Sequence, residues 1–263
     1  MSGTAPLLFE QDGAVATLTL NRPDIGNSID IDMARALVEA AIRCDHDPSV
    51  RCVVLTGAGR MFCAGGDLGL LTAAGAQAPA LLSELAGTLH MALSRFARMA
   101  KPLLVLVNGP AAGAGLSLAV AGDVVLATRS AHFTAAYTAV GLTPDGGLTW
   151  LLPRLVGLRK AQEMILTNRR IAADEAETLG LVTRTIDDEA FAEEGQATAA
   201  RLSRSAVSAL GAVRALLLES FSGELEAQME RETRAIAAAV AGPESAEGIA
   251  AFLAKRKPDF SGR

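Results

Sequence analysis

The stretch that decides the fold runs from Lys101 to Asp123 and reads KPLLVLVNGPAAGAGLSLAVAGD. Its apolar, β-rich run at residues 103–107 predicts a strand, and Asn108-Gly109-Pro110 predicts the turn that ends this strand. The small residues that follow predict a helix that begins at about Gly113. Such a corner between strand and helix presents unpaired backbone N–H groups and the positive end of a helix dipole, so it can bind an anionic oxygen.

The rest of the chain has the composition of a globular protein with a large core. It has 263 residues, of which 50% are hydrophobic but only 4% aromatic, so Ala, Leu and Val make up most of the apolar content. The net charge is −5, and Lys and Arg are scattered along the chain. This pattern does not indicate a nucleic-acid-binding surface.

The cysteines, the histidines and the N-terminal sequence further restrict the class of protein to which this chain can belong. The three cysteines form no C-x-x-C pair, which fits a reduced cytosol, and the three histidines are too far apart in the chain to predict a metal site. We interpret each histidine as structural, with His90 the most open to another role. The N-terminus lacks the pattern of a signal peptide, and the turn at 108–110 divides the uncharged stretch 102–122. We expect a soluble, cytoplasmic protein that does not enter a membrane.

Strand and helix patterns alternate along most of the chain. Further strands are predicted at residues 15–20, 51–56, 124–127, 132–134 and 181–185. Helices are predicted at residues 30–44, 79–99, 158–167 and 173–179, the first of them with Asp30 as its N-cap. Gly-rich loops occupy residues 57–71 and 141–147.

Beyond residue 188 nearly the whole chain has a helical pattern. Breaks are predicted at residues 203–205, 222–223 and 242–243. We therefore divide the chain into an α/β core, residues 1–200, and a C-terminal helical part, residues 201–263.

The sequence matches two well-known motifs only in part: the dinucleotide-binding fingerprint and the nucleophile elbow of esterases. The Gly-rich segments 57–62 and 113–118 end in Phe and Leu where a dinucleotide fingerprint needs its third Gly. Ser117 lies in a partial esterase elbow, but that fold needs a histidine later in the chain, and His132 in a neighbouring strand is the only one. We expect neither a Rossmann dehydrogenase nor a serine hydrolase.

The two Gly-rich loops that follow strands suggest a shared site. The stretch 62–68 supplies small residues, and residues 113–115 are all Gly or Ala, so backbone N–H groups can approach a ligand closely. One N–H from each loop could hold a single carbonyl oxygen. The alternative is that the small residues only allow tight packing of helix on strand, and the residues by themselves leave both interpretations open.

Five strings resemble the crotonase (enoyl-CoA hydratase/isomerase) superfamily in order and spacing, over nearly the whole chain. They are LNRP…NS, LTGAGRMFCAGGDL, NGPAAGAGLSLAVAGD, GLTPDGGLTWLLPRLVG and AFLAKRKPDF. The fourth and fifth are most similar to the 1,2-epoxyphenylacetyl-CoA isomerase branch. The resemblance implies an α/β spiral of repeated ββα units, followed by a helical region that forms trimers or dimers of trimers. It also implies an acyl-CoA thioester substrate, from fatty acid or phenylacetate metabolism, and no cofactor besides that coenzyme A.

The resemblance assigns roles to individual residues. The backbone N–H groups of Gly66 and Ala114 would hold the thioester oxygen, with Gly113 beside them. Positions that line the adenine end of coenzyme A in relatives are Ala64, Asp67 and Leu68.

Other assignments concern the ends of the substrate. Phe252 and Lys255 match an F-x-x-K pattern that reaches the coenzyme A of a neighbouring subunit. Where many relatives carry a basic residue between Pro23 and Asn27, this chain has none, so Arg22 and Lys255 would hold the phosphates alone. Leu142 and Tyr137 would shape the acyl pocket, together with residues 70–79 and 81–91.

The departures from the family pattern bear on the chemistry. Hydratases of the family use two Glu residues to activate water, and here those positions are Ser117 and Tyr137. Asp145, in Pro144-Asp145-Gly146-Gly147, is the remaining acid. Members with Asp at this place tend to be isomerases, and one dehalogenating branch uses it as a nucleophile. The alternative for Asp145 is a turn residue, since P-D-G-G is a common turn composition.

We therefore expect a CoA-thioester isomerase in which Gly66 and Ala114 stabilise an enolate and Asp145 is the single acid and base. Three alternatives stay open. The first is an enoyl-CoA hydratase in which Asp145 or Tyr137 replaces the Glu pair. The second is attack by Asp145 on a ring or epoxide carbon, which leaves a covalent ester. The third is a CoA-thioester-binding protein with weak or no catalytic activity.

Overall fold

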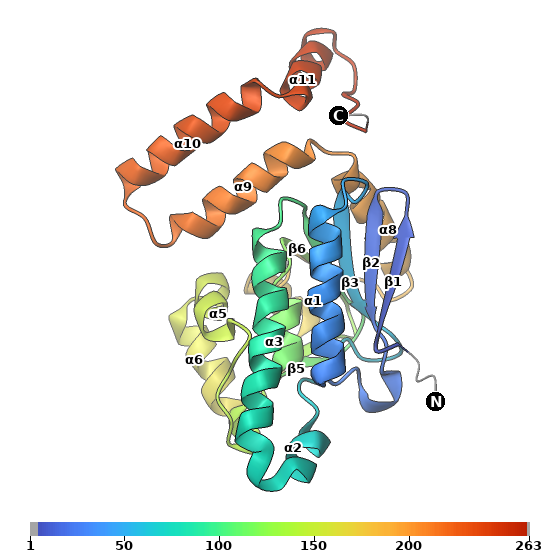
Figure 1. The fold of residues 1–263 in the computed structure, drawn as a ribbon, viewed down its shortest axis with the longest axis vertical. Coiled ribbons are helices and arrows are strands. Elements are labelled where there is room, and N and C mark those ends of the chain that lie inside the picture. Colours follow the sequence, from blue (N-terminus) through green and yellow to red (C-terminus); the bar gives the residue numbers. More distant parts are fainter. Residues whose placement is uncertain (1–4, 262–263) are drawn as a thin grey trace.

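The computed structural model describes residues 5–261 and has a twisted sheet at its centre (Figure 1). Six strands follow the order β1–β2–β3–β4–β6–β9, in which β1 and β2 are antiparallel and every other pair is parallel. Their bounds are β1 (Leu7–Asp12), β2 (Val15–Leu20), β3 (Cys52–Gly57), β4 (Leu103–Val107), β6 (Val124–Thr128) and β9 (Arg184–Ile186).

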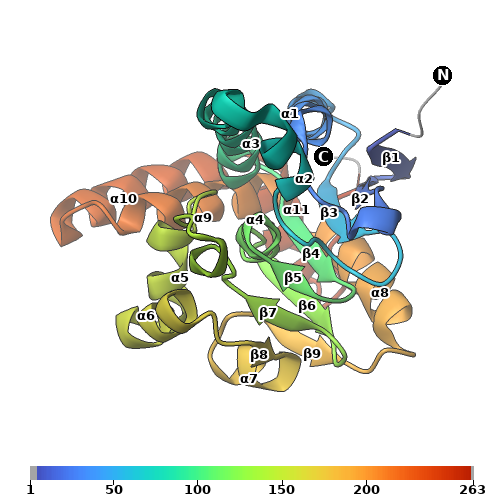
Figure 2. The same cartoon turned by 90° about the horizontal axis from the view of Figure 1, so that it is seen from below.

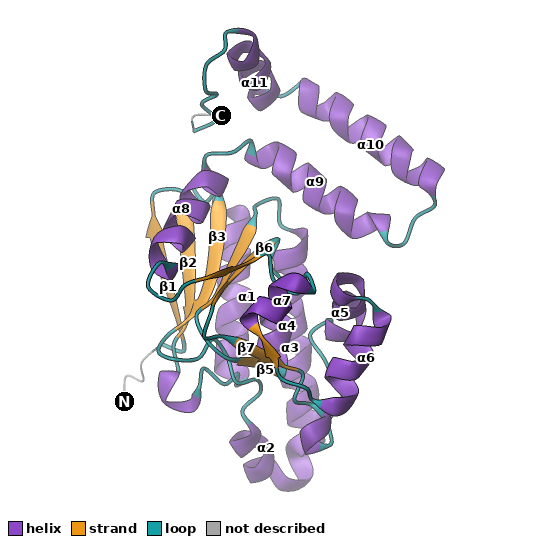
Figure 3. Cartoon of the chain, turned by 180° about the vertical axis from the view of Figure 1, so that it is seen from behind, coloured by secondary structure: helices purple, strands orange, loops and turns teal. Residues whose placement is uncertain are grey.

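Helices cover both faces of this sheet. α1 (Ile31–His46) and α3 (Ala78–Arg98) lie together on one face, and α8 (Phe191–Ser203) lies on the other, as the views in Figures 1 and 3 show. Side chains alternate across a strand, and β3 shows the result: Val53 and Leu55 enter the core on the α1 side, whereas Cys52 and Val54 pack with residues of α8. The central strands are thus buried on both faces, as parallel strands usually are.

A second, smaller sheet begins where β4 ends. It contains β5 (Ala111–Ala112), β7 (His132–Thr134) and β8 (Ile171–Ala172). α4 (Ala114–Ala119) starts directly after β5, and all of its residues are buried. Figure 2 shows α4 and this sheet at the end of the core that also carries α2 (Leu68–Ala74).

The remaining short elements complete the walls around this end of the core. They are the 3₁₀ turns η1 (Pro23–Ile25), η2 (Gly75–Gln77) and η3 (Thr138–Val140), and the helices α5 (Leu148–Val156), α6 (Leu158–Thr167) and α7 (Ala173–Thr178).

Three C-terminal helices extend away from the sheet (Figure 1). They are α9 (Val207–Ser220), α10 (Leu225–Val240) and α11 (Pro243–Leu253). α10 has no buried residue, and apolar side chains such as Leu217 and Ile236 are 61% and 71% exposed. Within residues 5–261, no single helix is long and apolar enough to cross a bilayer. α10 and α11, which meet at 76°, have the required length and hydropathy only when the two helices are counted together.

The predicted α/β fold with a helical C-terminal part is confirmed, and several elements have the predicted bounds, for example residues 103–107, 132–134 and 158–167. The prediction of a loop over residues 57–71 is wrong for residues 68–71, which are helical. Asp67 accepts hydrogen bonds from the Gly69 and Leu70 N–H groups, and this N-cap starts α2 at Leu68.

The strand predicted at residues 181–185 is also wrong in its bounds, because β9 starts only at Arg184. The division of the chain at residue 200 stays a prediction. That point falls inside α8, and Leu202 near the end of α8 still packs against the core on that face of the sheet.

Candidate active site

The two Gly-rich loops lie directly against each other. The Phe62 and Cys63 N–H groups donate to the Pro110 carbonyl, and the Ala112 N–H donates to the Cys63 carbonyl at 2.9 Å. A Cβ at Gly115 would lie 2.2 Å from that same Cys63 oxygen, so only glycine fits there. The tight-packing interpretation is therefore correct for Gly115.

Gly66 is different, because its surroundings are open. A Cβ placed on Gly66 would meet no atom of residues 5–261 within 4 Å. The preceding residue, Gly65, has a backbone conformation that other residue types rarely adopt, with φ +106°. A Cβ there would lie 3.4 Å from the Ala114 nitrogen. Gly65 thus brings the backbone of the first loop next to the start of α4 and leaves Gly66 facing free space.

The N–H groups of Gly66 and Ala114 have no hydrogen-bond acceptor among residues 5–261, whereas the preceding Gly113 N–H donates to Thr134 and the following Asp67 N–H donates to Ile29. Around Gly66 the chain forms a parallel bridge with Ile29, in which the Ile29 N–H donates to Gly65 and the Asp67 N–H donates to Ile29. Because Gly65 and Asp67 bond to Ile29 in this bridge, the N–H of Gly66 between them points away from Ile29. The Ala114 N–H is free because it belongs to the first turn of α4, where a helix has no acceptor for it.

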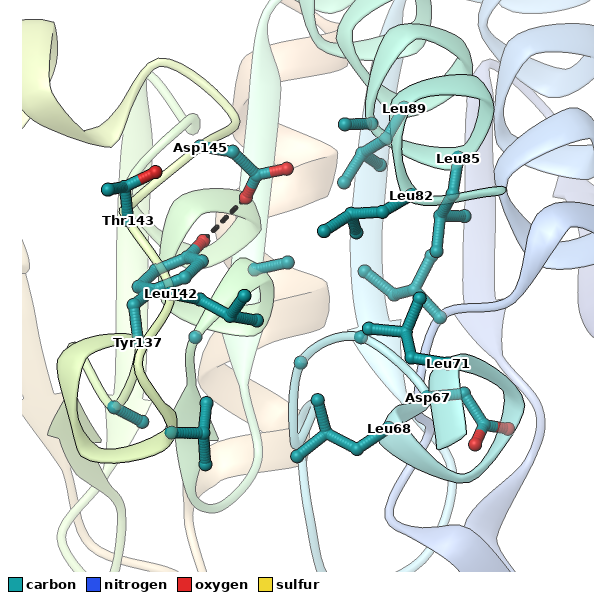
Figure 4. Close-up of a pocket in the computed structure, with 18 of the residues that line it drawn as sticks. Asp67, Leu68, Leu71, Leu82, Leu85, Leu89, Tyr137, Leu142, Thr143 and Asp145 are labelled. Atoms are coloured by element: carbon teal, nitrogen blue, oxygen red, sulfur yellow. Dashed lines mark hydrogen bonds between the residues drawn. The ribbon is translucent and has the colours of Figure 1, made fainter. Parts of the chain in front are cut away.

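Both of these residues line a cavity of about 540 Å³. Leucines of α2 and α3 form one wall, and Tyr137, Leu142, Thr143 and Asp145 form the opposite one (Figure 4). The leucine wall consists of Leu68, Leu71, Leu82, Leu85 and Leu89. Nine of the residues predicted from the sequence meet at this cavity: Ala64, Gly66, Asp67, Leu68, Gly113, Ala114, Tyr137, Leu142 and Asp145.

Asp145 is held at the cavity wall by hydrogen bonds and is only partly open to solvent. Its Oδ1 atom accepts the Tyr137 hydroxyl at 2.7 Å, and its backbone carbonyl accepts the Ser117 hydroxyl at 3.0 Å. Its side chain is 27% exposed. Asp145 therefore faces the cavity and does not point into bulk water.

Tyr137 does not have the properties of a base. Burial raises the pKa of its hydroxyl well above the ordinary value, and the adjacent Asp145 carboxylate raises it further. The hydroxyl stays protonated near neutral pH and acts as a hydrogen-bond donor. This argues against the alternative in which Tyr137 replaces a Glu of the hydratases.

His90 also belongs to this cluster, although no motif in the sequence predicts such a place for it. Its Nε2 atom accepts the Gly146 N–H at 2.9 Å and lies 3.6 Å from Oδ2 of Asp145. The spacing of Leu82, Ala86 and His90 at intervals of four along α3 is the signal that places all three on one side of that helix. Within residues 5–261, no group of His, Cys, Asp and Glu side chains could hold a metal ion.

Three predicted residues lie outside the cavity wall. The Arg22 guanidinium pairs with Asp30 at 3.0 Å and with Asp67 at 3.3 Å, so it braces the loop behind the cavity. Phe252 and Lys255 lie at the end of α11, which Figure 1 shows at the opposite end of the molecule from α2. Their predicted contact with a neighbouring subunit's coenzyme A stays a prediction.

Comparisons with known proteins agree on one family. A family model described as enoyl-CoA hydratase/isomerase matches residues 10–263. The 1,2-epoxyphenylacetyl-CoA isomerase of Escherichia coli (strain K12) is 37% identical over 98% of each chain. A probable enoyl-CoA hydratase of Rhodobacter capsulatus is 39% identical over 97% of each. The crystal structure of an enoyl-CoA hydratase from Polaromonas sp. JS666 has a TM-score of 0.92 and 35% identity, covering 96% of this chain and 98% of that one.

Proposed function

This chain belongs to the enoyl-CoA hydratase/isomerase family, which acts on CoA thioesters, and we propose that it isomerises a double bond, or an epoxide, of an enoyl-CoA with Asp145 as its single acid and base. Family membership confirms the resemblance seen in the sequence, including the crotonase-type spiral. The observation that carries the proposal is the position of two unpaired amides and one carboxylate on the wall of one cavity.

The two amides supply the electrostatic part of the mechanism. The Gly66 and Ala114 N–H groups donate to the thioester carbonyl oxygen, and their hydrogen bonds strengthen as that oxygen becomes an enolate. Each donor of this kind typically lowers the barrier by about 3 kcal/mol. The neighbouring C–H bond becomes acidic enough for a carboxylate to remove its proton.

Asp145 supplies the proton transfer. It removes a proton from one carbon and returns it to another, and a 1,3-shift needs only one such group. Asp67, the other acid on the cavity wall, pairs with Arg22 and caps α2, so its side chain is already engaged. A single available carboxylate favours isomerisation over the two-carboxylate hydration known in the family.

The cavity also favours a class of acyl group. Its leucine wall offers apolar contact along α2 and α3, and polar groups are concentrated near Asp145 on the facing wall (Figure 4). Burying apolar acyl surface against such a wall is favourable. We infer an apolar acyl chain or ring, of the kind found in fatty acid or phenylacetate metabolism.

We propose in addition a homotrimer or a dimer of trimers. The support is the exposed apolar surface of the C-terminal helices, which in a monomer would face water. Among its members are Leu217, Phe221, Leu225, Ile236 and Val240, between 57% and 71% exposed. Surfaces of this kind mark protein interaction sites.

A second candidate is covalent catalysis, in which Asp145 attacks an epoxide carbon as its C–O bond breaks, or a ring carbon as a ring substituent leaves, and forms an ester. It is favoured by the distance of 3.6 Å between Oδ2 of Asp145 and Nε2 of His90, because this nitrogen, once it releases the Gly146 N–H, could activate the water that hydrolyses the ester. Mass spectrometry of the protein quenched during turnover would detect an added mass that includes coenzyme A, because this attack leaves the thioester bond intact.

The experiment that tests the main proposal is a paired assay of the purified protein. A 3-enoyl-CoA is offered for isomerisation, and crotonyl-CoA is offered for hydration. We expect turnover of the first to exceed that of the second by at least about tenfold, because the usual pair of carboxylates is missing. Efficient hydration without isomerisation would contradict the proposal.

A further inference from the structure

The side chains of Tyr137 and Ser117 form a closed set of hydrogen-bond contacts with the carboxylate and the backbone carbonyl of Asp145. The Tyr137 hydroxyl lies 2.7 Å from Oδ1 of Asp145 and 3.1 Å from the Ser117 hydroxyl. The Ser117 hydroxyl in turn lies 3.0 Å from the backbone oxygen of Asp145. Tyr137 and Ser117 are 8% and 1% exposed, so water does not compete for these contacts.

The hydrogens in this set can be counted. When Asp145 is ionised it is an acceptor only, so the hydrogen between it and Tyr137 comes from the phenol. The single Ser117 hydrogen is then shared between the backbone carbonyl of Asp145 at 3.0 Å and the Tyr137 oxygen at 3.1 Å, as a three-centre bond that ties both groups to α4. Oδ1 therefore has a fixed donor.

The other carboxylate oxygen is in a different position. Figure 4 shows it directed away from Tyr137, toward the α3 side of the cavity. Its nearest charged or titratable neighbour given by the structure is Nε2 of His90 at 3.6 Å, and that atom already accepts the Gly146 N–H. Oδ2 is thus the oxygen that a substrate can reach.

The backbone around Asp145 is fixed as well. Gly146 has φ +63°, and a Cβ there would lie 2.8 Å from the Ser117 Cβ, so the turn lies directly on α4. Ser117 holds the carbonyl on one side of the turn, and His90 holds the Gly146 N–H on the other. The main chain and one side-chain oxygen of Asp145 are all restrained.

We propose that Tyr137 and Ser117 are positioning residues: Tyr137 binds Oδ1 of Asp145, Ser117 fixes Tyr137, and Oδ2 is left as the oxygen that exchanges the substrate's proton. This inference rests on the proposed function of Asp145. It gives a role to the two positions where this chain lacks the family's Glu pair.

Removal of the phenol hydroxyl is the direct test. In Tyr137→Phe the carboxylate loses a hydrogen bond and can rotate, so kcat for the 3-enoyl-CoA falls about 10–100-fold. KM changes less than about twofold, because the amides and the leucine wall are untouched. The acidic limb of the pH profile of kcat/KM moves to higher pH, since a hydrogen bond to the charged form of an acid favours that form.

Ser117→Ala and the double variant test the order of action. Ser117→Ala gives a smaller loss of kcat and a smaller displacement of the acidic limb in the same direction. If Ser117 acts through Tyr137, the double variant resembles Tyr137→Phe alone, and the two losses do not add. Ser94→Ala, which removes an exposed hydroxyl elsewhere on α3, is the matched control and keeps the wild-type rate and profile.

The positioning role predicts a lower kcat, a displaced acidic limb and non-additive losses. An unchanged kcat and pH profile in Tyr137→Phe, or fully additive losses in the double variant, overturns the inference. If Tyr137→Phe does not fold, as judged by circular dichroism, the displaced acidic limb of Ser117→Ala decides alone. Asp145→Asn separates the two levels: if it keeps full activity, the proposed function fails. If it is inactive while Tyr137→Phe is normal, only the positioning role fails.

Discussion

Gly115 on α4 lies so close to Cys63 that a Cβ at position 115 would come within 2.2 Å of the Cys63 carbonyl oxygen. This contact presses the second loop against the first and sets the separation of the two free amides. Gly115→Ala should lower the free energy of unfolding by about 1–3 kcal/mol and reduce isomerisation, because backbone has to move. Chemical denaturation and a rate assay measure both effects.

Gly87→Ala is the matched control for that substitution. Gly87 lies in α3 with an exposed backbone, and a Cβ there would meet nothing within 4 Å. Alanine at such a helical position should raise the free energy of unfolding by about 0.5–1 kcal/mol and leave the rate unchanged. Equal stability changes of the same sign in both variants would show that the contact with Cys63 has no special role.

His90 provides a second prediction, about the backbone beneath Asp145. His90→Ala removes the acceptor of the Gly146 N–H and should lower kcat about 3–10-fold, because that hydrogen bond helps to hold the turn. His90→Gln can place an oxygen near the Nε2 position and should recover most of the rate. Equal losses in both variants would instead point to a role of the imidazole itself, as in the covalent alternative.

The cysteines yield a prediction on pH dependence. Burial raises the pKa of Cys44 to about 11 and the pKa of Cys52 and of Cys63 to about 12. In the unfolded chain the thiols ionise near the ordinary value of 9.0. Ionisation of a thiol then stabilises only the unfolded state, so its contribution is fully present below pH 9 and is lost as pH rises toward 11–12.

Cys52→Ala isolates this contribution. Between pH 8 and 10, the free energy of unfolding of the wild type should fall by about 1.4 kcal/mol more than that of the variant. Urea titrations at the two pH values measure the difference. An identical pH dependence in both proteins would contradict the burial-induced shift. All three thiols should also stay unreactive toward a thiol reagent at pH 8 until the protein is unfolded.

The C-terminal helices carry the prediction on assembly. Sedimentation of the wild type should give the mass of a trimer or of a dimer of trimers. Ile236→Asp places a charge on a side chain that is 71% exposed in the single chain and should shift the protein toward smaller species. Glu232→Ala on the same helix is the control. A monomeric wild type would contradict the proposed interface.

Much of the fold could be predicted because local patterns and tertiary packing agree. The apolar run at residues 103–107 is buried except for the half-buried Leu106, and Asp30 caps α1 by accepting the Met33 N–H. Other elements could not be predicted from local patterns. β1 depends on its pairing with β2, and α5 contains Pro153 and follows two glycines, a composition that favours a loop.

The site was predictable only where a motif carries it. Gly66, Ala114 and Asp145 lie in family strings, and all three line the cavity. The hydrogen bonds of Tyr137 and the place of His90 could not be predicted, because they depend on how separate loops and helices pack together, which no local pattern specifies. His90 is 56 residues from Gly146, and only the fold brings them together.

The most direct test of the central claim is the rate of isomerisation of a 3-enoyl-CoA by Asp145→Asn, measured beside Asp174→Asn, whose carboxylate is exposed and remote from the cavity wall. Calorimetry should show that both variants still bind the acyl-CoA. We predict a loss of about 10²–10⁴-fold in kcat for Asp145→Asn and none for Asp174→Asn. Isomerisation by Asp145→Asn at close to the wild-type rate would contradict the account.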